Sequence, residues 1–326
     1  MTARSLLLLD TASLYFRAYY SVPEGMTAPD GTPVNAVRGL LDTIARLVET
    51  YRPERLVCCW DDDWRPQWRV DLVPSYKGHR VLGGVDPDTG APLDGSLDEG
   101  SGDGTEEVPD TLSPQVPVIV DVLAALGIAR VGAPGYEADD VIGTLAATAA
   151  GPTLVVTGDR DLFQVVDDDR GVAVLYTVAG GMPKWQELDG PAVRERYGVD
   201  PAVYADFAVL RGDASDGLPG VRGVGEKTAA RLVDAFGDLA GVRAVAADPT
   251  SVRPMTPAVR AALLAAADYL ERAEPVVRVA TDVALPEHDA RLPSAPPDPD
   301  LLGALAERWG LGGSVSRVLA ALAAGA

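Results

Sequence analysis

Three short apolar runs in this chain each end at an aspartate. The runs span residues 6–9, 56–60 and 153–157, and the aspartates that follow them are Asp10, Asp61 and Asp159. Short apolar runs bounded by turn residues are typical of buried parallel strands. Open α/β sheets bind their ligands outside the carboxyl ends of such strands. The pattern therefore predicts an α/β fold with three carboxylates converging at one edge of a mainly parallel sheet.

Further acidic residues lie near these strand ends. Asp161 follows Asp159 by two residues, and two clusters contain Glu137, Asp139 and Asp140, and Asp213 and Asp216. A solvated acidic rim explains a single aspartate after a strand, but not three strand ends together with two clusters. Because like charges repel strongly at low dielectric, so many carboxylates in one place favour hard cations bound between them.

Helical geometry restricts the cluster at 137–140, which begins an apolar helix. If the helix starts at Glu137, then Glu137 and Asp140 share a face and Asp139 points away from it. All three can serve one site only if Glu137 precedes the first full turn. The alternative is that acidic residues are favoured at a helix amino terminus, which explains one of them or two.

The composition is that of a globular protein with one large domain or two smaller ones. The chain has 326 residues, 47% of them hydrophobic, and charged residues interrupt its apolar stretches before membrane-spanning length. The first strand begins almost at once, so we expect no signal peptide and a cytoplasmic protein with no membrane partner. Cys58 and Cys59 are adjacent in a strand, so we expect buried, unpaired thiols without a chemical role.

The net charge of −20 argues against a general polyanion binder, since affinity for nucleic acid depends on cations that neutralise phosphates. Segment 64–80 is an exception to this acidic balance. It interleaves four cations with three aromatic residues, namely Arg65, Arg69, Lys77 and Arg80 with Trp64, Trp68 and Tyr76. Such a mixture suits an unpaired nucleic acid strand. A basic surface helix with packed aromatic residues is the alternative.

Two segments divide the chain into regions. Residues 81–110 are rich in Gly, Asp, Glu, Ser and Pro, which predicts a flexible acidic loop that is either a disordered insertion or a functional lid. Residues 293–300 separate the body from a final helical stretch at 301–309 and 315–322.

A helical region at 191–274, between the predicted sheet and this final stretch, contains the glycine-rich turn 217–228. This turn could offer N–H groups to phosphates and carbonyls to a monovalent cation. Helix hairpins also often turn at glycine, and the spacing is not that of a Walker loop.

In its motifs the chain resembles the bacterial 5′-3′ exonuclease and flap endonuclease family, which includes the amino-terminal nuclease domain of DNA polymerase I. The resemblance runs from residue 6 to about residue 285. The matching segments are 9–10 with 16–19, 31–37, 68–69 with 76–80, 137–144, 157–162, 212–216, 223–229 and 281–283.

The resemblance implies a PIN-like α/β nuclease domain with a mainly parallel central sheet, and a helical helix-three-turn-helix module that binds DNA. On this basis we expect the catalytic domain at 1–190, with the acidic insertion 81–110 in the region of a helical arch. The DNA-binding domain would span 191–290, and a linker and helical tail 291–326. The glycine turn would hold a potassium ion.

The resemblance also implies two-metal hydrolysis of phosphodiester bonds, with Mg²⁺ as the natural ion and Mn²⁺ as a substitute. Asp10, Asp61, Glu137 and Asp139 would hold the first metal, and Asp140, Asp159, Asp161, Asp213 and Asp216 the second or its water shell. Lys77 and Arg80 would clamp the scissile phosphate, and Tyr76 would stack on a displaced base. The implied DNA-binding residues are Arg17, Arg69, Tyr76, Gly223, Gly225, Lys227 and Thr228.

Three departures from the family pattern stand out. Asp61, Asp62 and Asp63 replace a single aspartate, so the metal ligand could be Asp61 or Asp62. Gly217 stands where the family has Asn. The acidic insertion falls where the arch should be.

Three functions are compatible with these observations. The first is a 5′ nuclease of replication and repair that acts on 5′ flaps and duplex 5′ ends of DNA. The second is the same chemistry on RNA in RNA–DNA hybrids, and the third is a catalytically idle module that binds DNA junctions. The complete set of carboxylates favours an enzyme over the idle module. We expect a monomer, and a DNA polymerase partner is not indicated by any motif.

Overall fold

The computed structural model describes residues 5–81, 108–250 and 253–325. Its centre is a six-stranded sheet in the order β3-β2-β1-β4-β5-β6. The strands are β1 (Leu6–Asp10), β2 (Arg55–Cys59), β3 (Ala129–Val131), β4 (Thr153–Thr157), β5 (Val172–Tyr176) and β6 (Gln186–Leu188). Neighbouring strands are parallel except at one edge, where β6 runs antiparallel to β5. The predicted mainly parallel sheet is therefore confirmed.

The three strands predicted from the apolar runs lie side by side in the sheet. β1 pairs with β2 on one side and with β4 on the other, so that Leu9 is opposite both Cys58 and Val156. The carboxyl ends of the three strands consequently lie at the same edge, which is where ligands bind in open sheets of this kind.

Successive residues of the strands pack against two different helical layers. Leu7 and Cys58 lie in the core on the side of α2 (Asn35–Tyr51) and α4 (Gln115–Leu126). Leu8 and Cys59 lie in the core on the side of α5 (Ala138–Thr148). This alternation is the period of two that a strand imposes on its side chains. The two cysteines are buried and unpaired, as predicted.

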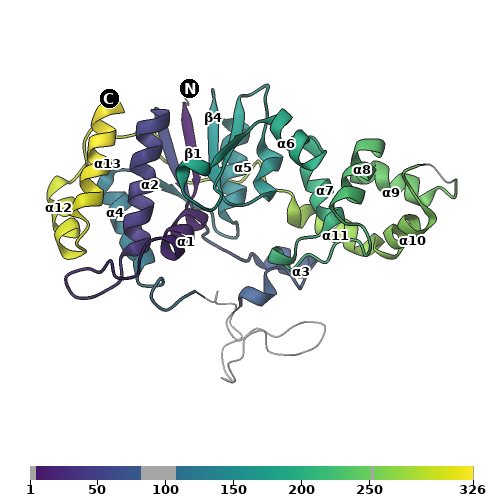
Figure 1. The fold of residues 1–326 in the computed structure, drawn as a ribbon, viewed down its shortest axis with the longest axis horizontal. Helices are drawn as coiled ribbons and strands as arrows, with labels where there is room; N and C mark the ends of the chain where they lie inside the picture. The colour runs from purple at the N-terminus through teal and green to yellow at the C-terminus, as the bar shows by residue number, and fades with distance from the viewer. Residues whose placement is uncertain (1–4, 82–107, 251–252, 326) are drawn as a thin grey trace, which may run out of the picture.

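The last two helices complete the layer on the side of α2. α12 (Pro299–Arg308) and α13 (Gly312–Gly325) lie beside α4 and α2, at the opposite end of the molecule from α8 to α10 (Figure 1). Val318 and Leu322 share a core with Leu40, and Arg317 is 2.8 Å from the carboxylate of Asp42. The carboxyl-terminal helices are thus packed onto the sheet unit.

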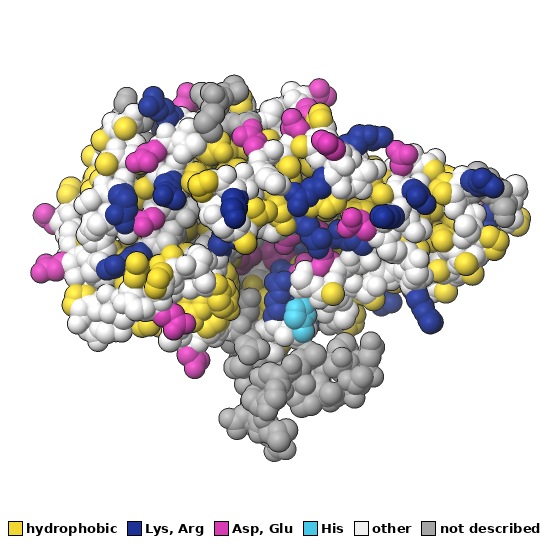
Figure 2. All heavy atoms as spheres, viewed as in Figure 1, with side chains coloured by type: hydrophobic (Ala, Val, Ile, Leu, Met, Phe, Trp, Pro, Cys, Tyr) yellow, Lys and Arg dark blue, Asp and Glu magenta, His cyan; other side chains and the backbone are white. Residues whose placement is uncertain are grey.

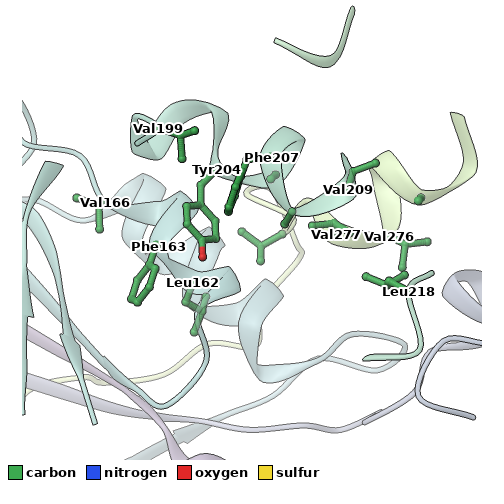
Figure 3. Packing of buried hydrophobic residues seen from close by; sticks show 14 of the residues in the cluster. Leu162, Phe163, Val166, Val199, Tyr204, Phe207, Val209, Leu218, Val276 and Val277 are labelled. Atoms are coloured by element: carbon green, nitrogen blue, oxygen red, sulfur yellow. The ribbon is translucent and has the colours of Figure 1, made fainter. Parts of the chain in front are cut away.

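A helical unit extends from the other edge of the sheet (Figure 1). Its helices are α6 (Gly190–Tyr197), α7 (Tyr204–Arg211), α8 (Glu226–Phe236), α9 (Leu239–Ala247), α10 (Pro257–Ala265) and α11 (Ala267–Val277). Figure 3 shows Tyr204 and Phe207 beside Phe163 of η2 (Asp161–Val165), and the rings of Phe163 and Tyr204 are 5.5 Å apart. The helical unit therefore packs directly on the segment that follows β4.

The remaining elements are short or lie at the carboxyl edge of the sheet. They are α1 (Thr11–Ser21), α3 (Gln67–Leu72) and the 3-10 helices η1 (Gly78–Arg80), η3 (Met182–Lys184), η4 (Pro201–Val203) and η5 (Ala214–Asp216). Residues 82–107, which form most of the predicted acidic insertion, lie outside the described residues. Within the described ranges, no helix combines the length and apolar character needed to cross a lipid bilayer.

Candidate active site

The carboxyl edge of the sheet opens into a cleft of about 520 Å³. Figure 2 shows a hollow in the middle of the molecule, with acidic and basic side chains around it. Six charged side chains line the cleft, namely Asp10, Asp61, Asp139, Asp159, Lys77 and Arg80. The fold thus gathers four of the nine predicted acids in one place with the two predicted phosphate-binding cations.

Asp10 joins the ends of β1 and β4. One carboxylate oxygen accepts a hydrogen bond of 2.6 Å from the Thr157 hydroxyl, and the other accepts one of 3.1 Å from the Ser13 backbone as the N-cap of α1. The backbone N–H of Asp159 donates to Thr157 Oγ1 at 2.8 Å, and that of Gly158 donates to Ser13 Oγ at 3.0 Å. These bonds fix Asp10 and Asp159 beside each other.

The start of α5 directs its three acids to different places. Glu137 is the N-cap, and it forms a capping box with Asp140, in which each side chain accepts from the other's backbone N–H. Asp139 instead lines the cleft. The backbone N–H of Ala138 donates to Asp61 Oδ1 at 2.8 Å, which ties this turn to the end of β2. Glu137 therefore precedes the helix, and the amino-terminal preference for acids explains Glu137 and Asp140 but not Asp139.

Arg69 of α3 is the buried counter-ion of these two acids. Its side chain is 2% exposed, and it lies 2.9 Å from Glu137 Oε2 and 2.8 Å from Asp140 Oδ1. Its Nε also donates to the Val276 carbonyl at the end of α11. Asp140 further accepts from the Ala280 backbone at 2.9 Å. One buried ion-pair network thus joins α3, α5 and the end of the helical unit.

This network contradicts three predictions. Arg69 and Tyr76 do not lie on a DNA-binding surface, because both are buried and both donate to Glu137. Tyr76 as a whole is 4% exposed, so in this position its ring cannot stack on a displaced base. Asp140 is not available as a metal ligand, because it is fully buried and both its oxygens accept from Arg69.

Lys77 and Arg80 line the cleft but are already paired with acids. Lys77 Nζ is 2.9 Å from Glu137 Oε1, and Arg80 Nη2 is 2.9 Å from Asp216 Oδ1. The backbone N–H of Lys77 donates to the Asp216 carbonyl at 2.9 Å. Gly217, which replaces the family's Asn, has a φ of +67°, and a Cβ there would lie 2.0 Å from the Ser75 carbonyl oxygen. The glycine thus allows the 213–217 turn to contact the segment that carries Lys77.

The remaining three acids form a second group behind the cleft, among arginines. Asp213 Oδ2 is 3.1 Å from both Arg160 and Arg211. Asp161 is buried, its backbone N–H donates to Asp159 Oδ1 at 2.8 Å, and its Oδ1 atom has no hydrogen-bond partner. Asp161, Asp213 and Asp216 therefore surround Asp159 without lining the cleft themselves, and their metal binding stays a prediction.

Burial and mutual repulsion disfavour charge on the cleft carboxylates. Burial raises the pKa of Asp10 to about 7, with Asp61 and Asp159 adding to the rise against the opposing Thr157 hydrogen bond. Burial also raises the pKa of Asp61, and it raises those of Asp139 and Asp159 with repulsion from neighbouring carboxylates. A bound cation would reverse this effect, because it stabilises the ionised carboxylates.

The chemistry of the cleft fits an oxygen-seeking divalent cation. Its acidic donors are all carboxylates, which suit Mg²⁺ and similar ions. In the three described ranges, no three His, Cys, Asp or Glu side chains already stand close enough to hold one ion. Carboxylates would therefore have to turn inward around a metal, and Mg²⁺ usually keeps several waters that can span the remaining gaps.

Asp61 and Asp62 lie in different surroundings. Asp61 lines the cleft, whereas Asp62 lies beside Gly132 with its carboxylate 3.5 Å from Arg130 and is exposed to solvent. The position of Asp61 supports its assignment as the ligand.

The predicted DNA-contacting glycines are open to solvent. Gly223 has a φ of +80°, Gly225 is the N-cap of α8, and a Cβ at either position would meet nothing within 4 Å. Lys227 is exposed and Thr228 half-buried in the first turn of α8. Arg17 lines a neighbouring groove of about 1230 Å³ along α1 and α2. Its Nε atom is buried without a hydrogen-bond partner.

Several residues that shape the site were not predicted. Thr157 and Ser13 position Asp10 and Gly158, and Arg160 and Arg211 balance Asp213. A weak indication that the two arginines pair with site acids was present in the sequence, because each is close in the chain to one. Arg160 follows Asp159 directly, and Arg211 comes two residues before Asp213. Thr157 begins the matching segment 157–162, but the match assigned it no role, and no pattern pointed to Ser13.

Comparison with known proteins identifies two family models along the chain. Residues 5–198 match the 5′-3′ exonuclease N-terminal resolvase-like domain, and residues 199–300 match the 5′-3′ exonuclease C-terminal SAM fold. A protein named 5′-3′ exonuclease from Streptomyces coelicolor is 60% identical over 98% of this chain and 100% of its own length. Another of that name from Mycobacterium tuberculosis is 50% identical over 97% of both chains.

Solved structures share the fold at low sequence identity. T5 5′-exonuclease with bound zinc matches 99% of this chain and 100% of its own, with a TM-score of 0.61 and 17% identity. The catalytic core of Rad2 in complex with a DNA substrate matches 98% of this chain and 93% of its own, with a TM-score of 0.60 and 16% identity.

Proposed function

The chain belongs to the 5′-3′ exonuclease family and is a nuclease, and we propose that it hydrolyses DNA with divalent metal ions at 5′ flaps and duplex 5′ ends. The observation that carries the proposal is the cleft in which Asp10, Asp61, Asp139 and Asp159 meet Lys77 and Arg80. Such a cleft combines oxygen ligands for metals with cations for a phosphate. This cleavage would serve DNA replication or DNA repair.

We propose Mg²⁺ as the ion, with Mn²⁺ as a substitute. Asp10, Asp61 and Asp139, with Glu137 behind them, would hold one ion, and Asp159 with the group Asp161, Asp213 and Asp216 would serve a second. The bound ions would supply a hydroxide from water and stabilise charge on the scissile phosphate. The T5 5′-exonuclease, which shares the fold, carries bound zinc, and this supports a metal requirement.

The chain's own cations would bind and orient the substrate. Lys77 and Arg80 reach the cleft from the same short segment, so they can contact one phosphate together. Arg17 lines the adjoining groove, which shares Ser13 and Phe16 with the cleft and could continue the path of a strand. The Thr157 hydroxyl would keep Asp10 in place during the reaction.

The helical unit would hold the duplex. Gly223 and Gly225 leave the start of α8 open, so a phosphate can approach the backbone N–H groups there. Lys227 and Thr228 would add side-chain contacts, and a potassium ion in the turn would bridge carbonyls and phosphate. On this view residues 1–190 cut the strand, residues 191–290 bind the duplex, and residues 291–326 support the sheet unit.

The decisive experiment separates cleavage from binding. Asp139→Asn and Asp159→Asn should each abolish cleavage of a labelled 5′ flap in Mg²⁺, while binding of the same flap in Ca²⁺ stays within several-fold of wild type. Asp168→Asn changes an exposed carboxylate outside the cleft and should cleave normally. Near-normal cleavage by both cleft variants would overturn the proposal. The same assay with an RNA-tailed flap measures whether hybrids are also cut.

A further inference from the structure

The two oxygens of Glu137 have different partners. Oε2 accepts from the buried Arg69 at 2.9 Å and from the buried Tyr76 hydroxyl at 2.8 Å. Oε1 accepts from Lys77 at 2.9 Å, and Lys77 lines the cleft with its side chain 12% exposed. Two buried side chains thus hold Oε2, whereas the side chain that bonds Oε1 comes from the cleft. The Asp140 backbone N–H also donates to this carboxylate in the capping box.

Lys77 also attracts three of the four cleft carboxylates, those of Asp61, Asp139 and Asp159. Against the effect of burial, Glu137 raises the pKa of Lys77 most, followed by Tyr76, Asp216 and Asp139. Lys77 in turn opposes the rise in the pKa of Asp61 and of Asp159. Arg80 also opposes the rise in the pKa of Asp61, but it pairs with Asp216, which does not line the cleft. Lys77 therefore supplies, as a single charge, part of the neutralisation that a divalent ion would supply.

Neighbouring residues hold the backbone of Lys77, whereas its ammonium is bonded only at the end of the side chain, to Glu137 Oε1 at 2.9 Å and to the Trp64 carbonyl at 3.4 Å. Lys77 has a φ of +47°, and in the described residues only Arg52 shares a positive φ among non-glycine residues. Such a conformation is unfavourable for a side chain with a Cβ and persists only where neighbours enforce it. Here Lys77 N–H donates to the Asp216 carbonyl, and Arg65 Nε donates to the Tyr76 carbonyl at 2.6 Å. The four-carbon stem can then move the ammonium between two positions without moving the backbone.

We propose that Lys77 is an exchangeable counter-ion of Glu137, which neutralises Oε1 when the cleft holds no divalent ion and is released toward the scissile phosphate when an ion takes that oxygen. The inference rests on the proposed function, because it requires a divalent ion at Glu137. A lysine ammonium and a metal cannot occupy the same side of one oxygen. The phosphate-binding cation is therefore delivered only to a metal-loaded cleft.

Nuclear magnetic resonance can follow this exchange in the intact protein. The chain contains three lysines, Lys77, Lys184 and Lys227. Lys184 and Lys227 are exposed, so their signals serve as internal references. In protein labelled at lysine, the ammonium protons of Lys77 should be protected from exchange without metal and lose that protection as Mg²⁺ saturates the cleft. A Lys77 signal that stays unchanged at saturating Mg²⁺ would overturn the exchange.

Metal affinity gives an independent measurement. Lys77→Met should tighten Mg²⁺ binding, measured by calorimetry, by about tenfold or more, since a directly competing unit charge is removed. The charge-matched control Arg80→Met should have a smaller effect, because Arg80 does not contact Glu137. In a Glu137→Gln background the gain from Lys77→Met should disappear. An equal gain in Mg²⁺ affinity in both backgrounds would show that Lys77 repels the ion only through its charge at a distance. That result would contradict direct competition for Glu137.

These results separate the exchange from the nuclease proposal. Mg²⁺ binding and flap cleavage with an unmoved Lys77 would overturn the exchange alone. If calorimetry detects no Mg²⁺ binding and the flap is not cut, the proposed function fails, and the exchange fails with it.

Discussion

Arg69 Nη2 lies 2.8 Å from Asp140 Oδ1, and neither side chain is more than 2% exposed. Arg69 Nη1 also contacts Asp140 Oδ2 and Glu137 Oε2, each at 2.9 Å. The pair joins α3, which precedes the Lys77 segment, to the turn of α5 that presents Asp139 to the cleft. Through the Val276 carbonyl it also reaches the helical unit. The position of Asp139 and that of the helical unit therefore depend on the same buried charge.

Removing this charge should destabilise the whole protein. Arg69→Met leaves Glu137 and Asp140 without their buried counter-ion, and breaking a buried pair from one side typically costs about 3–5 kcal/mol. Chemical denaturation measures this loss. Arg194 pairs with Asp200 and Asp234 on the surface, so Arg194→Met should leave the denaturation midpoint close to that of wild type. Similar midpoints for the two variants would contradict a structural role for Arg69.

The register of the acids after β2 can be tested by a pair of variants. Asp61→Asn removes a cleft carboxylate and should reduce Mg²⁺-dependent cleavage by about 10²-fold or more, the scale on which a preorganised charge supports catalysis. Asp62→Asn loses only its contact with Arg130 at the surface and should cleave at a near-normal rate. The opposite ranking in a single-turnover assay would assign the ligand to Asp62.

How far the sequence predicted the site depends on whether the determining contacts are local. The strand-end aspartates were predicted because a buried strand and its following residue are encoded in a few consecutive positions. The roles of Arg69 and Tyr76 were missed because a basic and aromatic segment has the same pattern whether its cations pair with DNA or with acids about 70 residues away. Burial decided between these alternatives.

The fold was likewise predictable where local sequence determines it and not where distant contacts do. The final apolar helices were expected from local composition, but their packing against α2 depends on contacts such as that of Arg317 with Asp42, which are distant in the chain. The preference of acidic residues for a helix amino terminus was one interpretation of the cluster at 137–140, and the reciprocal capping box of Glu137 and Asp140 became visible only with the backbone position of Glu137 before α5.

Two glycines of the 217–225 segment should respond differently to substitution. Gly225→Val should leave stability unchanged, because a Cβ there meets nothing within 4 Å, but it should weaken binding to flap and plain duplex alike if DNA backbone approaches that turn. Gly220→Val should instead destabilise the fold, since its φ is +66° and a Cβ would lie 2.6 Å from the Arg211 carbonyl. Thermal unfolding and fluorescence anisotropy measure the two effects.

A potassium ion in this turn would add a cation dependence to duplex binding. Binding in potassium should be tighter than binding in lithium at matched ionic strength, and Gly225→Val should reduce the difference. Equal affinity of the wild-type protein in both salts would remove the ion from the proposal.

The stability of the metal-free protein should fall as the pH rises from about 4 to about 7. The pKa of Asp10 is about 7 in the fold against an ordinary value of 3.8, and those of Asp61, Asp139 and Asp159 are also raised. In this interval the folded protein binds more protons than the unfolded chain, so each rise in pH favours unfolding. The stabilising contribution of each protonated carboxyl is complete at a pH below its pKa in the unfolded chain. It is lost as the pH rises past its pKa in the folded protein.

Mg²⁺ should oppose this dependence, because it binds the ionised carboxylates of the folded state and stabilises that state by mass action. Calorimetric scans with a chelator should give a higher Tm near pH 5 than near pH 8, and saturating Mg²⁺ should raise the Tm mainly at the higher pH. Asp10→Asn should reduce the pH dependence seen with the chelator, whereas Asp62→Asn, outside the cleft, should not. A Tm in chelator that rises from pH 5 to pH 8 would show that the cleft carboxylates are not held at raised pKa values.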